Sequence, residues 1–361
     1  MRTEGFGRRA GLAAFVALGV AIGVSSASGE VRLQGAGASF PAPFYKRLVS
    51  EYQKLHPGTQ IDYQSIGSGG GIRAITDKTV NFAGSDAPMS KKEMEAAGGD
   101  ANLVEIPSCA GGVVPTYNLP EVKQDLKFTG TLLADIYMGK VSRWNDPAIA
   151  ALNPGVALPD QAITPVWRTD GSGTTFIFTH YLATQSEAFL STIGADKQVK
   201  WPAGQGGKGN EGVTAVVQQT AGGLGYVEQG YADNNHLPYG AVVNKDGKLV
   251  KASPKSVSLA GVGAVSGMKG QILAATIWNQ SGEGAYPIAS FTYLIVYKDL
   301  NNAATKEAAQ ALVDYLWWVA HDGQKFATEL DYAPLAPAVQ EKVEQALKAI
   351  TYKGETLSVG R

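Results

Sequence analysis

The stretch "TPVWRTDGSGTTFIFTHYL", from Thr164 to Leu182, has the pattern of an apolar strand, a turn of small residues and a helix. The strand ends at Arg168, and the turn carries Asp170 and several glycines. A helix N-terminus presents unpaired backbone N–H groups and the positive end of the helix dipole. Glycines let an anion approach these N–H groups closely, and hydroxyls add further donors. The stretch therefore predicts an anion site at the start of a helix.

Two other stretches repeat this pattern. "LQGAGASFPAPFY" (33–45) places Ser39 and Phe40 before a helix that begins with proline, and "YQSIGSGGGIRAI" (63–75) places Ser68 before a short helix. For any one of the three, a serine cap after a glycine turn is the simpler interpretation. Three in one chain, one of them with an arginine, favour a common site for one small oxyanion.

Strand-like and helical segments alternate along the whole chain. "FYKRLVSEYQKLH" (44–56) has helical spacing, "QIDYQSIGS" alternates like a strand, and "SKKEMEAAG" starts with a capping box of Ser90 and Glu93. Long apolar strands are expected near 104–117 and 288–297. This alternation indicates an α/β fold with a parallel or mixed sheet, in which the two long strands connect two lobes.

Composition narrows the class of protein. The chain has 361 residues, which suggests two domains of ordinary size or one large domain, and its net charge of −1 gives no basic field for nucleic acid. Cys109 is the single cysteine, so disulfides and cysteine-based metal clusters are excluded, and we interpret it as a buried apolar residue. The four histidines have no metal-binding spacing. We therefore expect no metal and no cofactor.

The N-terminus has the three-part pattern of a secretory signal peptide. Arg2, Arg8 and Arg9 precede an apolar run from Gly11 to Val24, and small residues follow to Gly29. Cleavage after residue 27 or after residue 29 fits equally well, and the arginine pair leaves the twin-arginine route open. We expect residues 1–29 to be removed and the mature protein to be exported.

Nucleotide-binding and hydrolase motifs are incomplete. "GQGGKGN" (204–210) resembles a phosphate-binding loop of nucleoside triphosphatases, but its spacing is short and Gly209 stands where a hydroxyl is needed. A serine hydrolase could use Ser68 or Ser172, but Ile66 and Asp170 occupy glycine positions of the nucleophile elbow. An enzyme is thus the less favoured alternative.

Six motifs taken together resemble one family along nearly the whole mature chain, from about residue 31 to the C-terminus. They are "GAGASFPAPFY", "SIGSGGGIRAI", "FAGSDAPMS", "WRTDGSGTTFIFTHYL", "GGKGNEGVTAVV" and "GGLGYVE". Their order and spacing resemble the periplasmic phosphate-binding protein of the bacterial phosphate ABC transporter. The resemblance implies a type II periplasmic binding protein, with two α/β lobes of mixed sheet, crossing hinge strands and a ligand cleft between the lobes. It places residues 30–114 and 288–361 in one lobe and residues 115–287 in the other. A periplasmic location of the mature protein is implied only by this resemblance.

The resemblance also implies a set of phosphate-binding residues. Asp170 is expected to pair with Arg168 rather than to contact the ligand. Ser39 stands where threonine is common in the family, and both residues supply a hydroxyl. The residues implied to bind phosphate are Ser39, Phe40 (through its backbone), Ser68 and Asp86 from one lobe, and Arg168, Ser172, Gly173 and Thr174 from the other.

The expected function is high-affinity binding of inorganic phosphate and its delivery to the membrane permease, by a monomer that is not an enzyme. Asp86 suits this ligand because an ionised carboxylate can accept the proton that phosphate carries at neutral pH. Sulfate carries no such proton, and it would place two negative charges face to face. The alternatives are a binder of another tetrahedral oxyanion and, less favoured, a serine-dependent phosphatase or hydrolase.

Overall fold

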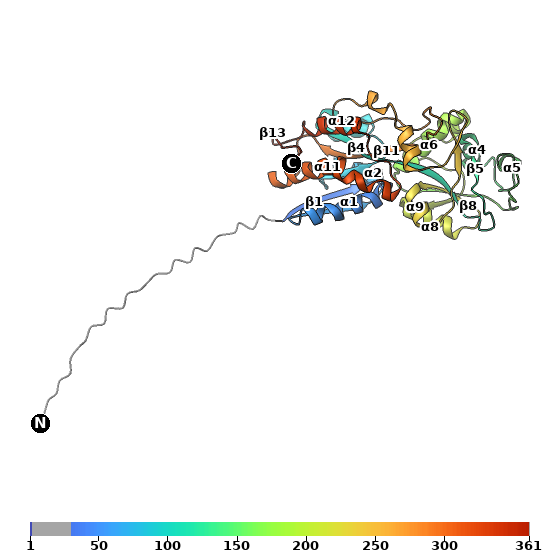
Figure 1. Ribbon diagram of the computed structural model, residues 1–361, viewed down its shortest axis with the longest axis horizontal. Coiled ribbons are helices and arrows are strands. Elements are labelled where there is room, and N and C mark those ends of the chain that lie inside the picture. Colours follow the sequence, from blue (N-terminus) through green and yellow to red (C-terminus); the bar gives the residue numbers. More distant parts are fainter. Residues whose placement is uncertain (2–29, 361) are drawn as a thin grey trace.

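A mixed eight-stranded sheet runs the length of the protein, in a computed structural model that describes Met1 and residues 30–360 (Figure 1). Its strand order is β2-β1-β3-β11-β4-β8-β6-β7. The strands are β1 (Val31–Gly37), β2 (Thr59–Ser65), β3 (Phe82–Ser85), β4 (Leu103–Tyr117), β6 (Thr164–Arg168), β7 (Gln205–Gly207), β8 (Gly223–Glu228) and β11 (Ala289–Tyr297). The predicted signal peptide lies outside the described residues, apart from Met1.

Twelve α-helices flank this sheet in the described part of the chain. They are α1 (Ala42–Leu55), α2 (Ser68–Thr76), α3 (Lys91–Ala96), α4 (Gly130–Tyr137), α5 (Pro147–Leu152), α6 (Gly173–Gln185), α7 (Glu187–Thr192), α8 (Gly209–Gln219), α9 (Gln229–Asn234), α10 (Pro254–Ala260), α11 (Lys306–Ala320) and α12 (Pro337–Leu347). Within residues 30–360, none of them has both the length and the apolar character needed to cross a bilayer. Two small sheets complete the fold, β10 (Leu249–Val250) with β9 (Ala241–Val243) and β5 (Lys127–Phe128), and β12 (Thr351–Tyr352) with β13 (Glu355–Thr356).

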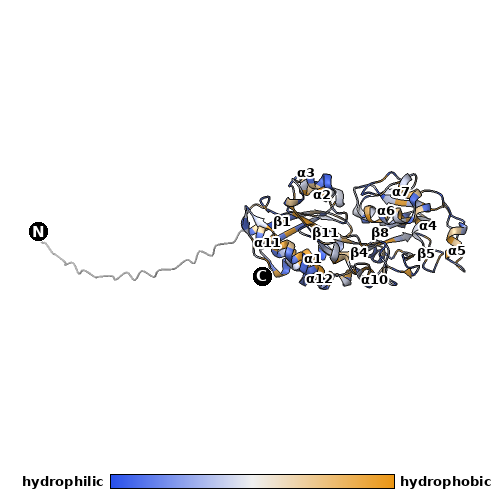
Figure 2. Ribbon diagram, turned by 90° about the horizontal axis from the view of Figure 1, so that it is seen from above, coloured by the Kyte–Doolittle hydropathy of each residue, from blue (hydrophilic) through white to orange (hydrophobic). Residues whose placement is uncertain are grey.

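The elements form two lobes that lie side by side (Figures 1 and 2). The first lobe contains β1, β2 and β3 with helices α1, α2, α3, α11 and α12, and the second contains β6, β7 and β8 with helices α4 to α8. β4 and β11 join them at the middle of the sheet. The α/β class, the mixed sheet and the connecting role of the two long strands are as the sequence predicts, whereas the limits of the lobes stay a prediction.

β4 passes from one lobe into the other. Its N-terminal part, Leu103–Gly112, pairs with β11, and its C-terminal part, Val113–Tyr117, pairs with β8. All fifteen of its residues are buried. A strand that is buried on both faces needs a continuous apolar run rather than an alternating one. For this reason the sequence of residues 104–117, which is apolar apart from Glu105, Ser108 and Thr116, was sufficient to predict the strand.

Local signals also position the helices as predicted. In α1, the buried residues Phe44, Tyr45, Leu48 and Tyr52 follow three- and four-residue spacing, and the helix begins directly after Pro41. At α3, the Ser90 hydroxyl accepts the backbone N–H of Glu93, and the Glu93 carboxylate accepts the backbone N–H of Ser90. The predicted capping box is therefore confirmed.

One segment contacts a different lobe from the one to which the sequence analysis assigned it. Residues 269–275 belong to the range predicted for the second lobe, yet they lie along β4 in the first-lobe part of the sheet. The backbone N–H of Glu105 donates to the Gln271 carbonyl at 2.8 Å, and the N–H of Leu273 donates to the Glu105 carbonyl at 2.8 Å. Slightly further on, Trp278 contacts the rings of Phe176 and His180 on α6. The segment thus touches both lobes.

Candidate functional site

The three predicted helix starts meet at the seam between the lobes. The Ser68 hydroxyl, at the start of α2, accepts the backbone N–H of Gly173 at the start of α6, at 3.1 Å. It also accepts the N–H of Asp86 at 3.1 Å and lies 3.3 Å from the Asp86 carboxylate. Ser172 caps α6 by accepting the N–H of Thr175 at 3.0 Å. Ser39, in the turn before α1, completes the first-lobe side and is buried.

A fourth helix start, which the sequence analysis missed, joins this group. Asn210 lies in the first turn of α8, and its backbone N–H donates to the Ser39 hydroxyl at 3.0 Å. Its side-chain amide donates to Ser39 at 2.9 Å and to Thr174 at 3.0 Å, and its carbonyl accepts the N–H of Glu228 at 2.9 Å. The stretch "GGKGNEG" has the same strand, small residues and helix as the other three. That signal was available, but the stretch was used only as a family motif and in a comparison with nucleotide-binding loops, and Asn210 was not named as a site residue.

Arg168 is the cation of the site. Its side chain is 1% exposed, and its Nε and Nη2 donate to the two oxygens of Asp170 at 2.8 and 2.6 Å. Its Nη1 donates to the Thr174 hydroxyl at 3.2 Å. Asp170 also accepts the N–H of Gly209 at 3.0 Å. Burial alone would raise the pKa of Asp170, but the contacts with Arg168 and Gly209 outweigh burial and lower it, so this carboxylate is ionised at neutral pH.

Asp86 is the second carboxylate of the site, and its surroundings differ from those of Asp170. Burial raises the pKa of Asp86 to about 7, although hydrogen bonds from Thr292 and Ser68 and the charge of Arg168 act in the opposite direction. The Thr292 hydroxyl donates to it at 2.8 Å from β11. Thr292 is a second residue that the sequence analysis missed, because it stands in a strand with no motif. The Asp86 carboxyl faces the seam between the lobes. Because its pKa is about 7, neutral pH lies close to the midpoint of its ionisation.

The backbone supplies further donors. The N–H groups of Phe40 and Thr174 have no hydrogen-bond partner within residues 30–360. The Phe40 carbonyl is held by the Tyr332 hydroxyl at 2.7 Å, which fixes the turn before α1. At Gly173, a Cβ would overlap with the Asp86 carboxylate and the Ser68 hydroxyl, so only glycine allows the lobes to come this close. The arrangement can therefore surround a small oxyanion with fixed neutral dipoles, one cation and one acceptor.

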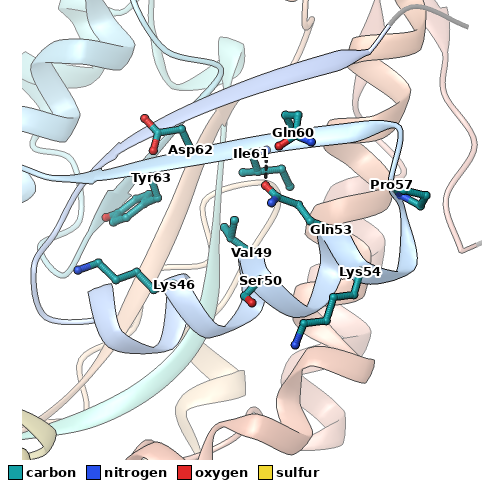
Figure 3. Close-up of a pocket in the computed structure, with 10 residues that line it drawn as sticks. All are labelled: Lys46, Val49, Ser50, Gln53, Lys54, Pro57, Gln60, Ile61, Asp62 and Tyr63. Atoms are coloured by element: carbon teal, nitrogen blue, oxygen red, sulfur yellow. Dashed lines mark hydrogen bonds between the residues drawn. The ribbon is translucent and has the colours of Figure 1, made fainter.

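An open groove elsewhere on the protein lacks the donors and charged groups of the candidate site. It has a volume of about 610 Å³ and lies between α1 and β2, on the outer side of the first lobe (Figure 3). Its lining includes Lys46, Val49, Gln53 and Tyr63 and contains none of the predicted site residues. In residues 30–360, no group of three or more His, Cys, Asp or Glu side chains is placed to hold a metal ion.

A fold of two α/β lobes, with helix starts facing each other across the seam, defines the class of periplasmic binding proteins. In agreement with this, the sequence model of the PBP superfamily domain matches residues 24–317. The crystal structure of a phosphate-binding protein from Stenotrophomonas maltophilia has the same fold, with a TM-score of 0.65 at 21% identity over 87% of this chain and 93% of that one. The predicted type II fold is thereby confirmed.

Sequence relatives narrow the class to one family. The phosphate-binding protein PstS of Pasteurella multocida is 44% identical over 88% of this chain and 90% of its own length. The phosphate-binding protein PstS of Xylella fastidiosa is 42% identical over 87% of this chain and 84% of its own length. The chain belongs to the PstS family of phosphate-binding proteins.

Proposed function

We propose that this protein binds inorganic phosphate between its lobes and delivers it to the permease of a phosphate ABC transporter. The observation that carries the proposal is the meeting of four helix starts, one arginine and one buried carboxyl at a single point of the seam. Ser39, Ser68, Arg168, Ser172, Gly173, Thr174 and the Phe40 backbone are the proposed donors, and Asp86 is the proposed acceptor.

The strength of binding follows from the number of fixed donors. Hydrogen bonds to a charged group contribute roughly 1.5–3 kcal/mol each, and micromolar affinity requires about 8 kcal/mol. Several such bonds, less the loss of translational and rotational freedom, are sufficient for micromolar binding or better. One arginine is enough because neutral dipoles provide most of the contacts.

Asp86 determines which oxyanion fits. Phosphate carries at least one O–H at neutral pH, and an ionised carboxylate accepts it in a short charge-assisted bond. A fully deprotonated anion such as sulfate or molybdate would face the carboxylate with no proton between them. Arsenate carries a proton as phosphate does, and we expect it to bind.

The family relationship opposes a serine hydrolase. Nucleophilic serine needs a base within hydrogen-bond reach. None of the described histidines bonds to Ser68 or Ser172, whereas the Ser68 hydroxyl lies 3.3 Å from the Asp86 carboxylate. The relationship to phosphate-binding proteins therefore supports a binder rather than an enzyme.

The remaining parts of the proposal concern location and partners. The signal-peptide pattern of residues 1–29 supports export to the periplasm, where a monomer would close over phosphate and present the closed lobes to the permease. We propose residues 30–114 and 288–361 as one moving body and residues 115–287 as the other. Residues 269–278, which contact both bodies, would flex or follow the first one.

Calorimetric titration of the mature, phosphate-stripped protein with phosphate and then sulfate at pH 7.5 tests the proposal. The expected result is binding of one phosphate per chain and no heat with sulfate. Equal binding of both ions would keep the oxyanion site but contradict the role of Asp86. Binding of neither would contradict the proposed function.

A further inference from the structure

An ion pair crosses the seam beside the proposed phosphate site. The Nζ of Lys197, which follows α7 in the second lobe, lies 3.0 Å from Oε2 of Glu93 on α3 in the first lobe. Their side chains are 15% and 26% exposed, so water screens this pair less than it screens a surface pair. It is the one ion pair within residues 30–360 that joins the two lobes.

The first-lobe end of the pair is held in place by its own helix. Oε2 of Glu93 accepts the backbone N–H and the hydroxyl of Ser90, each at 2.8 Å. Burial alone would raise the pKa of Glu93, but the hydrogen bonds from Ser90 and Lys197 outweigh it and hold the pKa below its ordinary value. Glu93 is thus ionised at neutral pH, and its rotamer is fixed without Lys197. Little side-chain entropy remains to be lost when the pair forms.

The second-lobe end is tied to the proposed phosphate site. The Lys197 carbonyl accepts the backbone N–H of Ser172, the cap of α6, at 2.9 Å. One residue earlier, the N–H of Asp196 donates to the Thr179 hydroxyl on the same helix at 3.2 Å. Lys197 and the start of α6 therefore move as one piece. A movement that carried Gly173 to Ser68 would therefore carry Lys197 to Glu93 as well, since both contacts are made in this structure.

The pair stands at a side opening of the seam. A cavity of about 390 Å³ is lined by Gly69, Gly171, Arg73, Glu93 and Lys197, among others. At its inner side the N–H of Gly69 donates to the Gly171 carbonyl at 2.8 Å, which closes the seam between this cavity and the proposed site. Lys197 and Glu93 thus lie where the lobes must separate before a bound ion can leave on this side.

We propose that Lys197 and Glu93 form a latch that holds the lobes closed and sets the rate of phosphate release. The proposal rests on the proposed function. The latch contacts no ligand, and its two ends are apart when the lobes are apart. Loss of the pair therefore raises the free energy of the closed form alone, so the dissociation rate changes while the association rate does not.

The test uses Lys197→Met and Glu93→Gln in the full mature protein. Glutamine keeps the capping box, so α3 stays intact while the charge is lost. Release of ³²P-phosphate into excess unlabelled phosphate measures the dissociation rate. We expect each variant to release phosphate about tenfold faster, which corresponds to about 1.4 kcal/mol, with an unchanged association rate. The double variant should be no faster than either single one, because both remove the same interaction.

Lys248→Met is the matched control, because Lys248 pairs with Glu283 at 3.2 Å within the second lobe. It should release phosphate at the wild-type rate. Wild-type release rates in Lys197→Met and Glu93→Gln would overturn the latch. A double variant in which the two effects multiply would overturn it as well, since the residues would then act separately.

A second measurement keeps the latch testable if the ligand is not phosphate. Absence of phosphate binding by the wild-type protein would contradict the proposed function. Small-angle scattering without phosphate then tests the latch by itself. Lys197→Met and Glu93→Gln, but not Lys248→Met, should increase the radius of gyration, because they shift the population towards open lobes. Equal radii in all four proteins would overturn the latch.

Discussion

The hydroxyl of Ser68 accepts the backbone N–H of Gly173 at 3.1 Å, and this bond joins the first turns of α2 and α6 across the seam. The two turns can approach this closely because residue 173 has no side chain. An oxyanion bound between them would meet donors from both lobes at once. Closure and binding are therefore one event at this point of the molecule.

Gly173→Ala should weaken phosphate binding strongly without unfolding the protein. The added Cβ would overlap with the Asp86 carboxylate and the Ser68 hydroxyl, so the lobes would have to stay apart. We expect a loss of about 100-fold in affinity, or about 3 kcal/mol, by calorimetry. Gly58→Ala is the control, since a Cβ there meets nothing within 4 Å and should leave affinity unchanged. A Gly173→Ala protein with wild-type affinity would contradict the closed geometry of the site.

Asp86→Asn should reduce the discrimination between phosphate and sulfate. The amide keeps the size of the side chain and its bond from Thr292, but it removes the charge that repels sulfate. We expect the ratio of the two affinities to fall by about 100-fold, or about 3 kcal/mol. Ser39→Ala removes one donor and should weaken both ions alike. Equal rejection of sulfate by the two variants, measured by competition, would show that Asp86 does not carry the selectivity.

Asp86 should also make the stability of the phosphate-free protein depend on pH. Its pKa is about 7 in the folded protein and 3.8 as the ordinary value, so the folded state binds more protons between these limits. The free energy of unfolding therefore falls as pH rises from about 4 to 7, by up to about 4 kcal/mol from this group. Asp86→Asn should remove that fall and be the more stable protein at pH 8, as measured by urea unfolding. Parallel pH profiles of the two proteins would contradict this prediction.

Arg168→Lys should lower phosphate affinity although the charge is kept. Lysine cannot reproduce the two parallel bonds to Asp170 together with the bond to Thr174. We expect a loss of about 10- to 100-fold. Arg143→Lys is the control, because Arg143 pairs with Asp160 on the surface, where exposed ion pairs contribute little. Wild-type affinity in Arg168→Lys would mean that only charge matters at this position.

The sequence pointed to those residues of the candidate site that stand at recognisable helix starts, and their role in binding stays a prediction. Ser68, Ser172 and Gly173 stand at glycine-rich helix starts, and such starts can be recognised within a dozen residues. Thr292 could not be found this way. It contacts Asp86, which is 206 positions away in the sequence, because β11 and β3 are neighbours in the sheet. The sequence of neither strand indicates this pairing. Asn210 had a local signal but was compared with the wrong kind of loop.

In the fold, as in the site, features marked by local sequence were predictable, and features that depend on long-range contacts were not. β4 was predictable because its fifteen buried residues form a run that is apolar apart from Glu105, Ser108 and Thr116. The return of residues 269–275 to β4 was not, because backbone bonds at Glu105 hold them and no side-chain pattern marks them. Sequence periodicity reports burial of side chains, and it is silent about contacts made by the backbone alone.

The position of β11 sets the order in which the protein can be completed. This strand fills the middle of the sheet between β3 and β4, although it follows Ser85 by about 200 residues. At about 5–20 residues per second, a ribosome needs roughly 10–40 s to synthesise that interval. Until β11 has been made, the edge of β3, and that of β4 once it has been made, stays unpaired on this side and can bind other chains. The first lobe, although its chain begins first, finishes folding after the second lobe has been made.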